Sequence, residues 1–201
     1  MKMKAAEDIK QFFDTHGGLL RTRELYAQKI FYKDLRQFVS DGYIEKVRYG
    51  YYQWLDEDNP SEARLINQLF PDGILNMYTA LFYHGYSDRT PSAWHIAVSK
   101  DSGKSRFKID YPFVHPYFVE PALLDVGLNS GDIDGNTVRI YDKERTICDC
   151  LRYRNKMDRE TFNKAIRAYV NDSSKSILRL MEYAGILRVT DTAKNLVGVW
   201  L

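Results

Sequence analysis

The sequence predicts an α+β protein of two domains: residues 1–57 with helices and a hairpin, and residues 58–201 with mixed α+β structure. In residues 5–54 the apolar spacing is helical up to Gly42 and typical of strands after it. The acidic segment DEDNP (56–60) closes this part with a proline. Beyond it, β-rich runs precede long helical patterns, the order typical of an α+β domain. With 201 residues, 44% of them hydrophobic, the chain can bury a core.

The N-terminal domain begins with a helix over residues 5–14, whose apolar face consists of Ile9, Phe12 and Phe13. The residues His16-Gly17-Gly18 end this helix. Thr22 is the expected N-cap of a second, short helix that runs through Ala27, because its hydroxyl can accept an unpaired amide proton. Gln28-Lys29 forms the break that follows.

A third helix is expected over residues 31–41, and it has two different sides. At 100° per residue, Phe31, Leu35, Phe38 and Val39 share an apolar side. The opposite side carries Lys33, Arg36, Gln37 and Ser40, with Tyr32 on its flank. Gly42 follows at a position that needs positive φ, which glycine adopts without steric cost.

The segment YIEKVRYGYYQW (43–54) predicts a hairpin that turns at Arg48-Tyr49-Gly50. A helix with Lys, Arg, Gln and Ser on its outer side suits the DNA major groove, and such a hairpin can contact the backbone beside it. We therefore predict a winged helix-turn-helix; the alternative is an ordinary solvated helix face. The predicted DNA-binding residues are Arg21, Thr22, Arg23, Tyr32, Lys33, Arg36, Gln37, Ser40, Lys46, Arg48 and Tyr49.

The net charge of +2 is unevenly distributed along the chain. Residues 1–55 hold ten Lys/Arg against seven Asp/Glu, whereas the remainder holds nineteen against twenty. This surplus is weak support for nucleic-acid binding; the placement of the cations is stronger. The apolar runs are too short to span a bilayer, and the start MKMKAAEDIK has no signal-peptide core, so we expect a cytoplasmic protein without membrane contact.

In the second domain, helices are expected over residues 61–70 and from an Asn76 N-cap through Tyr83. Strands are expected at 94–98, 106–110 and 136–141, the last after an Asp134-Gly135 turn, with an irregular stretch at 112–121. The C-terminal part reads as helices at 143–154, 158–170 and 173–185, with Gly185 as a second C′ glycine. Thr190 starts a last short helix, unless NLVGVWL (195–201) forms a strand.

No residue pattern predicts a metal, a cofactor or a disulfide. Cys148 and Cys150 point away from each other on a helix, and we expect one buried and one incidental thiol. The four histidines show no ligand spacing. His84 is expected at a helix end and His95 as a half-buried sheet residue, while His16 and His115 stand apart.

Asp142, Glu144, Arg145 and Asp149 form the one cluster that suggests catalysis, since carboxylates beside an arginine serve phosphoryl transfer. The structural interpretation is favoured: Asp142 caps a helix, Glu144 interacts with its dipole, and Arg145 pairs with Asp149 at i,i+4. No nucleotide-binding, hydrolase or metalloprotease motif is present, so no catalytic residue is predicted.

The second domain carries many cations, which could form a second basic face on DNA or toward a protein partner, or merely solvated faces. The candidates are Lys100, Lys104, Arg106, Lys108, Arg152, Arg154, Lys156, Arg159, Lys164 and Arg167, with Lys175 and Arg179 on the later helices.

Several segments together resemble one family across nearly the whole chain. They are residues 19–52, TALFYHGYSDRTP (79–91), WHIAV (94–98), VRIYDKERTICDCLR (138–152) and RLMEYAGILRV (179–189). In these segments the chain resembles the AbiEi-type antitoxins of bacterial abortive-infection (type IV toxin–antitoxin) systems. It departs from the family pattern at Tyr49, where a basic residue is expected in the wing, and in the loop SKDSGKS (99–105), which is poor in arginine.

The resemblance implies an antitoxin that also represses its own operon by binding inverted repeats in the promoter through the winged helix. The second domain would counter a nucleotidyltransferase-like toxin without forming a stable complex. Two alternatives remain open: a nucleic-acid-processing enzyme targeted by the winged helix, and a solitary repressor without a toxin.

Overall fold

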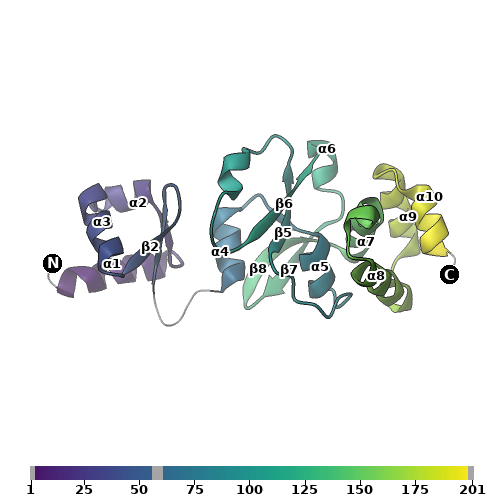
Figure 1. Cartoon of the computed structure of the whole chain (residues 1–201), viewed down its shortest axis with the longest axis horizontal. Helices are drawn as coiled ribbons and strands as arrows, with labels where there is room; N and C mark the ends of the chain where they lie inside the picture. Colours follow the sequence, from purple (N-terminus) through teal and green to yellow (C-terminus); the bar gives the residue numbers. More distant parts are fainter. Residues whose placement is uncertain (1–2, 56–60, 199–201) are drawn as a thin grey trace. The chain divides into compact units, whose positions relative to one another are not determined.

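The computed structural model describes residues 3–55 and 61–198. It is an α+β structure with two sheets and, within these residues, ten α-helices (Figure 1). The chain divides into two compact units. The first takes the described residues up to Pro71 together with Lys108–Pro112, and the second takes Asp72–Phe107 and the described residues from Phe113 onward. The boundary predicted between residues 57 and 58 lies outside the described residues.

The first unit contains four helices and a three-stranded antiparallel sheet of order β1-β3-β2. Its core gathers large apolar side chains from each element before residue 55, among them Phe13, Leu25, Leu35, Phe38 and Trp54. The elements are α1 (Met3–Thr15), β1 (Leu19–Arg21), α2 (Thr22–Ala27), α3 (Tyr32–Ser40), β2 (Ile44–Arg48), β3 (Tyr51–Trp54) and α4 (Glu62–Leu69).

The turns of this unit agree with the sequence prediction. The break after α2 contains Lys29 at φ 61°, and Gly42 ends α3 at φ 75°. Beyond Gly42, the Tyr43 amide donates to the carbonyl of Phe38 at 3.0 Å, which closes the last turn of the helix. The predicted first helix and the hairpin are confirmed as elements.

Two predictions for the first unit are wrong. Thr22 is not the N-cap: residues 19–21 pair with β3, so Arg21 is the cap residue, and its amide donates to the Glu24 carboxylate at 2.7 Å. The apolar side of α3 is narrower than expected. Leu35 and Phe38 are 2% and 1% exposed, but Phe31 and Val39 are 55% and 42% exposed because Phe31 precedes the helix and Val39 lies past its buried edge.

The second unit is built on a mixed five-stranded sheet of order β6-β5-β4-β8-β7. Strand β4 runs antiparallel to β5 and parallel to β8, and β6 is a parallel edge strand beside β5. The strands are β4 (Ile74–Leu75), β5 (Trp94–Ser99), β6 (Val114–Val119), β7 (Leu128–Ile133) and β8 (Asn136–Tyr141).

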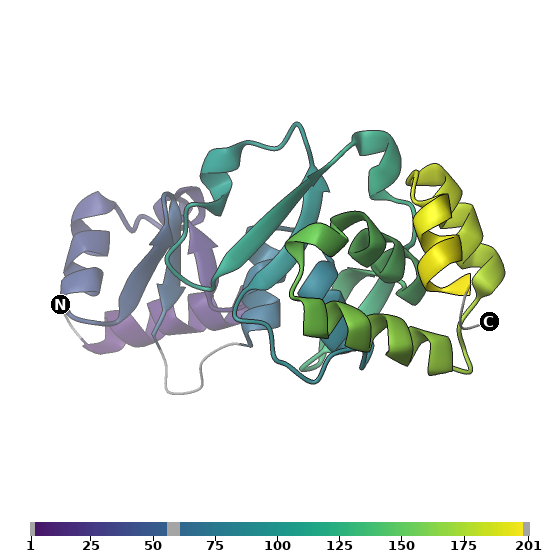
Figure 2. The same ribbon diagram turned by 45° about the vertical axis from the view of Figure 1, so that its right-hand side comes forward.

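The helices of this unit supply most of its apolar core. α5 (Met77–Tyr83) packs on β5, and the C-terminal helices lie together at one side of the sheet (Figure 2). Their shared core includes Leu81, Ile147, Leu151, Tyr169 and Leu180. The remaining helices are α6 (Pro121–Leu124), α7 (Lys143–Tyr153), α8 (Arg159–Asn171), α9 (Ile177–Ile186), α10 (Thr190–Leu196) and the 3-10 turns Lys104–Phe107 and Arg154–Lys156.

The predicted strand at 106–110 is wrong, because Lys104–Phe107 forms a 3-10 turn. The strand lies later, at β6, inside the stretch predicted to be irregular. Pro116 is tolerated there because β6 is an edge strand that needs fewer amide donors. The sequence did not predict three strands: the short strands β1 and β4, and β7, which pairs with β8 in a hairpin.

Gly185 is not a C′ glycine. Helix α9 continues through it to Ile186, and Arg188 takes the positive φ of 59° instead. Asn76 precedes α5 as predicted, but its side chain makes no capping bond, and its buried Oδ1 has no partner among the described residues. Residues 190–196 form the predicted last helix, so the alternative strand does not begin at Asn195; its end, residues 199–201, lies outside the described residues.

Candidate nucleic-acid interface

Helix α3 turns one side to the core and the other to solvent. Leu35 and Phe38 are buried, while Tyr32, Lys33 and Arg36 are exposed. Within residues 3–55 and 61–198, neither Lys33 nor Arg36 forms an ion pair. These two cations are therefore free to meet an anion from outside the chain.

Two other polar residues of α3 form hydrogen bonds within the chain. Gln37 donates its amide to Asp41 at 2.7 Å, and Asp34 accepts the Phe31 amide at 3.0 Å, which fixes the start of the helix. Ser40 is exposed at the last position of α3. The bond to Asp41 uses one of the two amide protons of Gln37, so the second proton and the amide oxygen can still bind another group.

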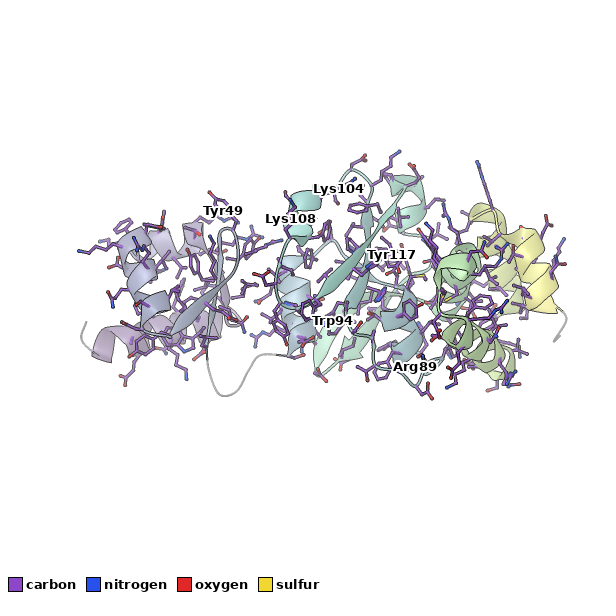
Figure 3. The ribbon with its side chains drawn as sticks, viewed as in Figure 1. Tyr49, Arg89, Trp94, Lys104, Lys108 and Tyr117 are labelled. Atoms are coloured by element: carbon purple, nitrogen blue, oxygen red, sulfur yellow. The ribbon has the colours of Figure 1, made fainter. Side chains whose placement is uncertain are left out.

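The β2–β3 hairpin projects Tyr49 at its tip, where the side chain is 92% exposed (Figure 3). Gly50 takes a φ of 77° in the turn. The Thr22 amide donates to the Gly50 carbonyl at 2.9 Å, so the hairpin tip is held against the start of α2. The Lys46 ammonium lies 5.5 Å from the centre of the Tyr49 ring, which places a cation beside the exposed ring.

Arg48, one of the residues predicted for the wing, is half-buried and packed within the unit. Its guanidinium lies 4.0 Å from the centre of the Tyr51 ring and donates to the carbonyl of Leu69 at 3.2 Å. Arg21 also lies over Tyr51, at 5.4 Å, whereas Arg23 is exposed. Among the predicted arginines of this region, Arg23 and Arg36 are the exposed ones.

The candidate second basic face divides into paired and unpaired cations. Lys100 binds Glu120 at 2.6 Å, Arg106 binds Asp72 at 2.8 Å, and Lys164 binds Asp88 at 3.0 Å. Lys175 donates to the carbonyl of Asp172, and Arg179 lies 3.8 Å from Glu144. Exposed cations without an ion pair in the described chain are Lys104, Lys108, Arg152, Arg154, Lys156, Arg159 and Arg167.

In the cluster that suggested catalysis, Glu144, Arg145 and Asp149 are buried and Asp142 is half-buried. Asp142 caps α7 by accepting the Arg145 amide at 2.8 Å, and Arg145 Nε donates to Asp149 Oδ1 at 3.1 Å, as predicted. Arg145 also donates to the carbonyls of Leu123 and Val126 at 2.7 and 2.6 Å. Burial raises the pKa of Asp149, and Arg145 opposes that rise. The enzyme hypothesis expected a pocket open to solvent at these side chains, which instead lie in the interior.

Glu144 does more than interact with a helix dipole. Its side chain is buried, and its Oε1 accepts the Ser176 amide at 2.8 Å and the Tyr169 hydroxyl at 3.4 Å. It thereby ties α7 to the start of α9. Cys148 and Cys150 are both buried, so the expectation of one incidental thiol is wrong.

The histidines have separate environments, and in the described residues no group of three metal-binding side chains occurs. His84 follows α5 as expected and bonds the carbonyl of Tyr141 at 2.8 Å; burial lowers its pKa. His95 is half-buried, as predicted. Burial, reinforced by the neighbouring His115, lowers the pKa of His95 to about 4, so its imidazole is neutral at pH 7.

Strand register brings five rings of the second unit together, which the sequence prediction missed. His95 and His115 are opposite each other on β5 and β6, and Tyr117 follows two residues later on β6. Tyr78 from α5 and Tyr153 from α7 complete the group. Twenty residues separate the two histidines, so no local spacing could have indicated this cluster.

Comparison with known proteins finds no family model that matches this chain and no matching curated protein. No helix in the described part of the chain is both long and apolar enough to cross a membrane.

Proposed function

We propose that the N-terminal residues form a winged helix-turn-helix that binds duplex DNA. Helix α2, the turn at Lys29 and helix α3 would be the helix-turn-helix, and the β2–β3 hairpin would be the wing. In this arrangement α3 enters the major groove, and Tyr49 and Lys46 approach the backbone beside it.

The observation that carries this proposal is the exposure of Lys33 and Arg36 without an acidic partner, on a helix anchored by Leu35 and Phe38. A rigid helix that holds cations in solvent can pair with phosphates and with guanine O6 and N7 at little ordering cost. Arg23 and Ser40 extend the same role, while Arg21 and Arg48 position Tyr51 and the hairpin.

We further propose that the protein is a transcriptional autorepressor and antitoxin of the AbiEi type. This part rests on the resemblance of segments such as residues 138–152. The DNA partner would be inverted repeats in the promoter of its own operon. The second unit would counter a nucleotidyltransferase-like toxin without a stable complex.

A gel shift on the DNA upstream of the operon tests the DNA-binding proposal. Lys33→Ala and Arg36→Ala should each weaken binding about 5- to 150-fold, if each side chain binds a base or phosphate with about 1–3 kcal/mol. Each should also lower the salt slope of binding by about one. Lys194→Ala, which removes an exposed cation on α10, is the matched control and should bind as wild type does. Wild-type affinity in both α3 variants would show that another face binds the DNA.

The antitoxin role needs its own test. If a nucleotidyltransferase-like reading frame follows this gene, the protein should restore growth to cells that express that toxin. The Lys33→Ala/Arg36→Ala variant should lose repression but keep the growth rescue, since rescue is assigned to the second unit. Repression without any rescue would favour the solitary repressor, and turnover of a nucleic acid by the purified protein would favour the enzyme.

A further inference from the structure

The five rings of the second unit form one connected group, here called the aromatic row: Tyr78, His95, His115, Tyr117 and Tyr153. Within it, His95 also lies 5.7 Å from Tyr117. Successive ring centres lie 4.9 Å apart for Tyr78 and His95 and 5.2 Å apart for His95 and His115. The separations are 5.0 Å from His115 to Tyr117 and 5.3 Å from Tyr117 to Tyr153. Tyr117 lies over the strands of the sheet in Figure 3, with Trp94 at the start of β5.

The row reaches solvent at the edge strand β6. His115 is exposed there, and so is Phe113, which immediately precedes the strand. The Trp94 amide donates to the Phe113 carbonyl at 2.7 Å, which holds this entry segment in place. The remaining rings of the row are half-buried, and two of them, His95 and Tyr117, contact the His115 ring.

Four exposed cations without an ion pair in the described chain lie in the sequence around and after Tyr153, here called the basic segment: Arg152, Arg154, Lys156 and Arg159. Both ends of the row contact this part of the chain. The Lys156 ammonium lies 6.0 Å from the centre of the Tyr153 ring, and the Asp158 amide donates to the Tyr78 hydroxyl at 3.0 Å.

The acids nearest in sequence to the basic segment are already occupied. Asp158 lies 3.5 Å from Arg89, and Glu160 lies 2.6 Å from the same guanidinium. Asp158 also accepts the Thr161 amide at 2.9 Å as the cap of α8. Residues 152–159 hold four cations and one acid, Asp158, so this segment keeps a net positive charge.

We propose that the aromatic row and the basic segment form a binding site for single-stranded nucleic acid. Unpaired bases offer their π faces for stacking on aromatic rings, and the phosphates between them need cations at the same spacing. His115 would stack a base at the sheet edge, and the basic segment would hold the adjoining backbone. The base faces of a duplex are buried in its stack. Duplex DNA could therefore bind the cations through its phosphates but could not stack bases on the rings.

Fluorescence anisotropy of the full chain tests this site with three probes of one mixed sequence: a 12-nucleotide RNA, the same single-stranded DNA, and the annealed duplex. The wild type should bind the single strands more tightly than a duplex that lacks the operator sequence. His115→Ala should weaken single-strand binding about tenfold, the loss of one base stack. His115→Phe should retain most of the affinity, because the stacking surface remains. His16→Ala removes an exposed imidazole from the first unit and should change nothing.

The cations give a second, independent measurement. The double variant Arg154→Gln/Lys156→Gln should lower the salt slope of single-strand binding by about 1.4, which is about 0.7 for each phosphate that is no longer neutralised. Arg188→Gln/Lys194→Gln is the charge-matched control and should keep the wild-type slope. Circular dichroism melting of each variant separates a binding defect from a folding defect.

The outcomes separate this site from the duplex-binding proposal. Lys33→Ala/Arg36→Ala should weaken binding of the operator duplex and leave single-strand binding unchanged. His115→Ala should weaken single-strand binding about tenfold and leave binding of the operator duplex unchanged. Preference for RNA over single-stranded DNA would assign the site to RNA, and the opposite preference to single-stranded DNA. The proposal is overturned if wild type prefers the nonspecific duplex, or if folded His115→Ala and His115→Phe bind single strands equally well.

Discussion

Helices α3 and α7 carry similar mixtures of charged and apolar residues but use their charges in opposite ways. In α3, Lys33 and Arg36 are exposed and have no ion pair in the described chain. In α7, Arg145 and Asp149 are buried against each other, with side-chain exposures of 1% and 5%. A charged residue on a helix therefore indicates a binding surface only when nothing in the fold neutralises it.

The two environments lead to different energetic roles. A buried ion pair is sensitive to the loss of one partner, because the other charge is then left without solvent or counter-charge. An exposed cation contributes little to folding and remains available for an external anion. We therefore expect substitutions in α7 to change stability and substitutions in α3 to change binding.

The largest expected effect is at Arg145. Arg145→Ala leaves Asp149 buried without its partner and should lower the free energy of unfolding by about 3–5 kcal/mol, measured by urea denaturation. The double variant Arg145→Met/Asp149→Leu should recover part of the loss. It removes both charges and keeps the volume, but it leaves the carbonyls of Leu123 and Val126 without their donor. A loss below about 1 kcal/mol in the single variant would mean that the pair is not buried as described.

Replacing Gly42 or Gly185 by alanine should change the stability of the protein in opposite directions. Gly42 has a φ of 75° and open space around it, so Gly42→Ala is strained by conformation alone and should destabilise by about 1 kcal/mol. Gly185 lies inside α9, also with open space, so Gly185→Ala should stabilise by about 0.5–1 kcal/mol. The melting temperature should fall for Gly42→Ala and rise for Gly185→Ala, as measured by thermal melts. A shift in the same direction for both variants would contradict the assigned helix ends.

The smallest effect on stability is expected in α3. Lys33→Gln and Arg36→Gln should change the free energy of unfolding by less than about 0.5 kcal/mol, because neither side chain packs in the core. The same variants should lose affinity for the operator duplex. A loss of stability above about 1 kcal/mol at either position would show that the charges of α3, like those of α7, contribute to folding.

Local patterns predicted some single-residue features well and missed others, such as the caps expected at Thr22 and Gly185. Gly42 required positive φ, Asp142 capped α7, and Asp134-Gly135 made the β7–β8 turn. Local patterns predicted poorly where a segment's structure depends on residues that are far away in the sequence. Residues 106–110 alternate like a strand, yet they lie outside the sheet, and β6 forms around Pro116 because an edge position was available.

The candidate sites also combine features that local sequence predicted with features that it could not predict. The sequence alone separated the cations of α3 from its buried Leu35 and Phe38, because helical periodicity fixes which side chains share a face. It could not tell that Arg48 packs on Tyr51 or that Lys164 is neutralised by Asp88, since neither interaction follows a helical repeat.

For this protein, the sequence by itself determined where most helices lie, the turns at Gly42 and Asp134-Gly135, and which cations of α3 face solvent. These features depend on residues a few positions apart. Only the tertiary structure decided which charges are neutralised and which rings meet. His95 and His115 are twenty residues apart and become neighbours through the register of two parallel strands. That register is set by the packing of the whole sheet, which no local pattern encodes.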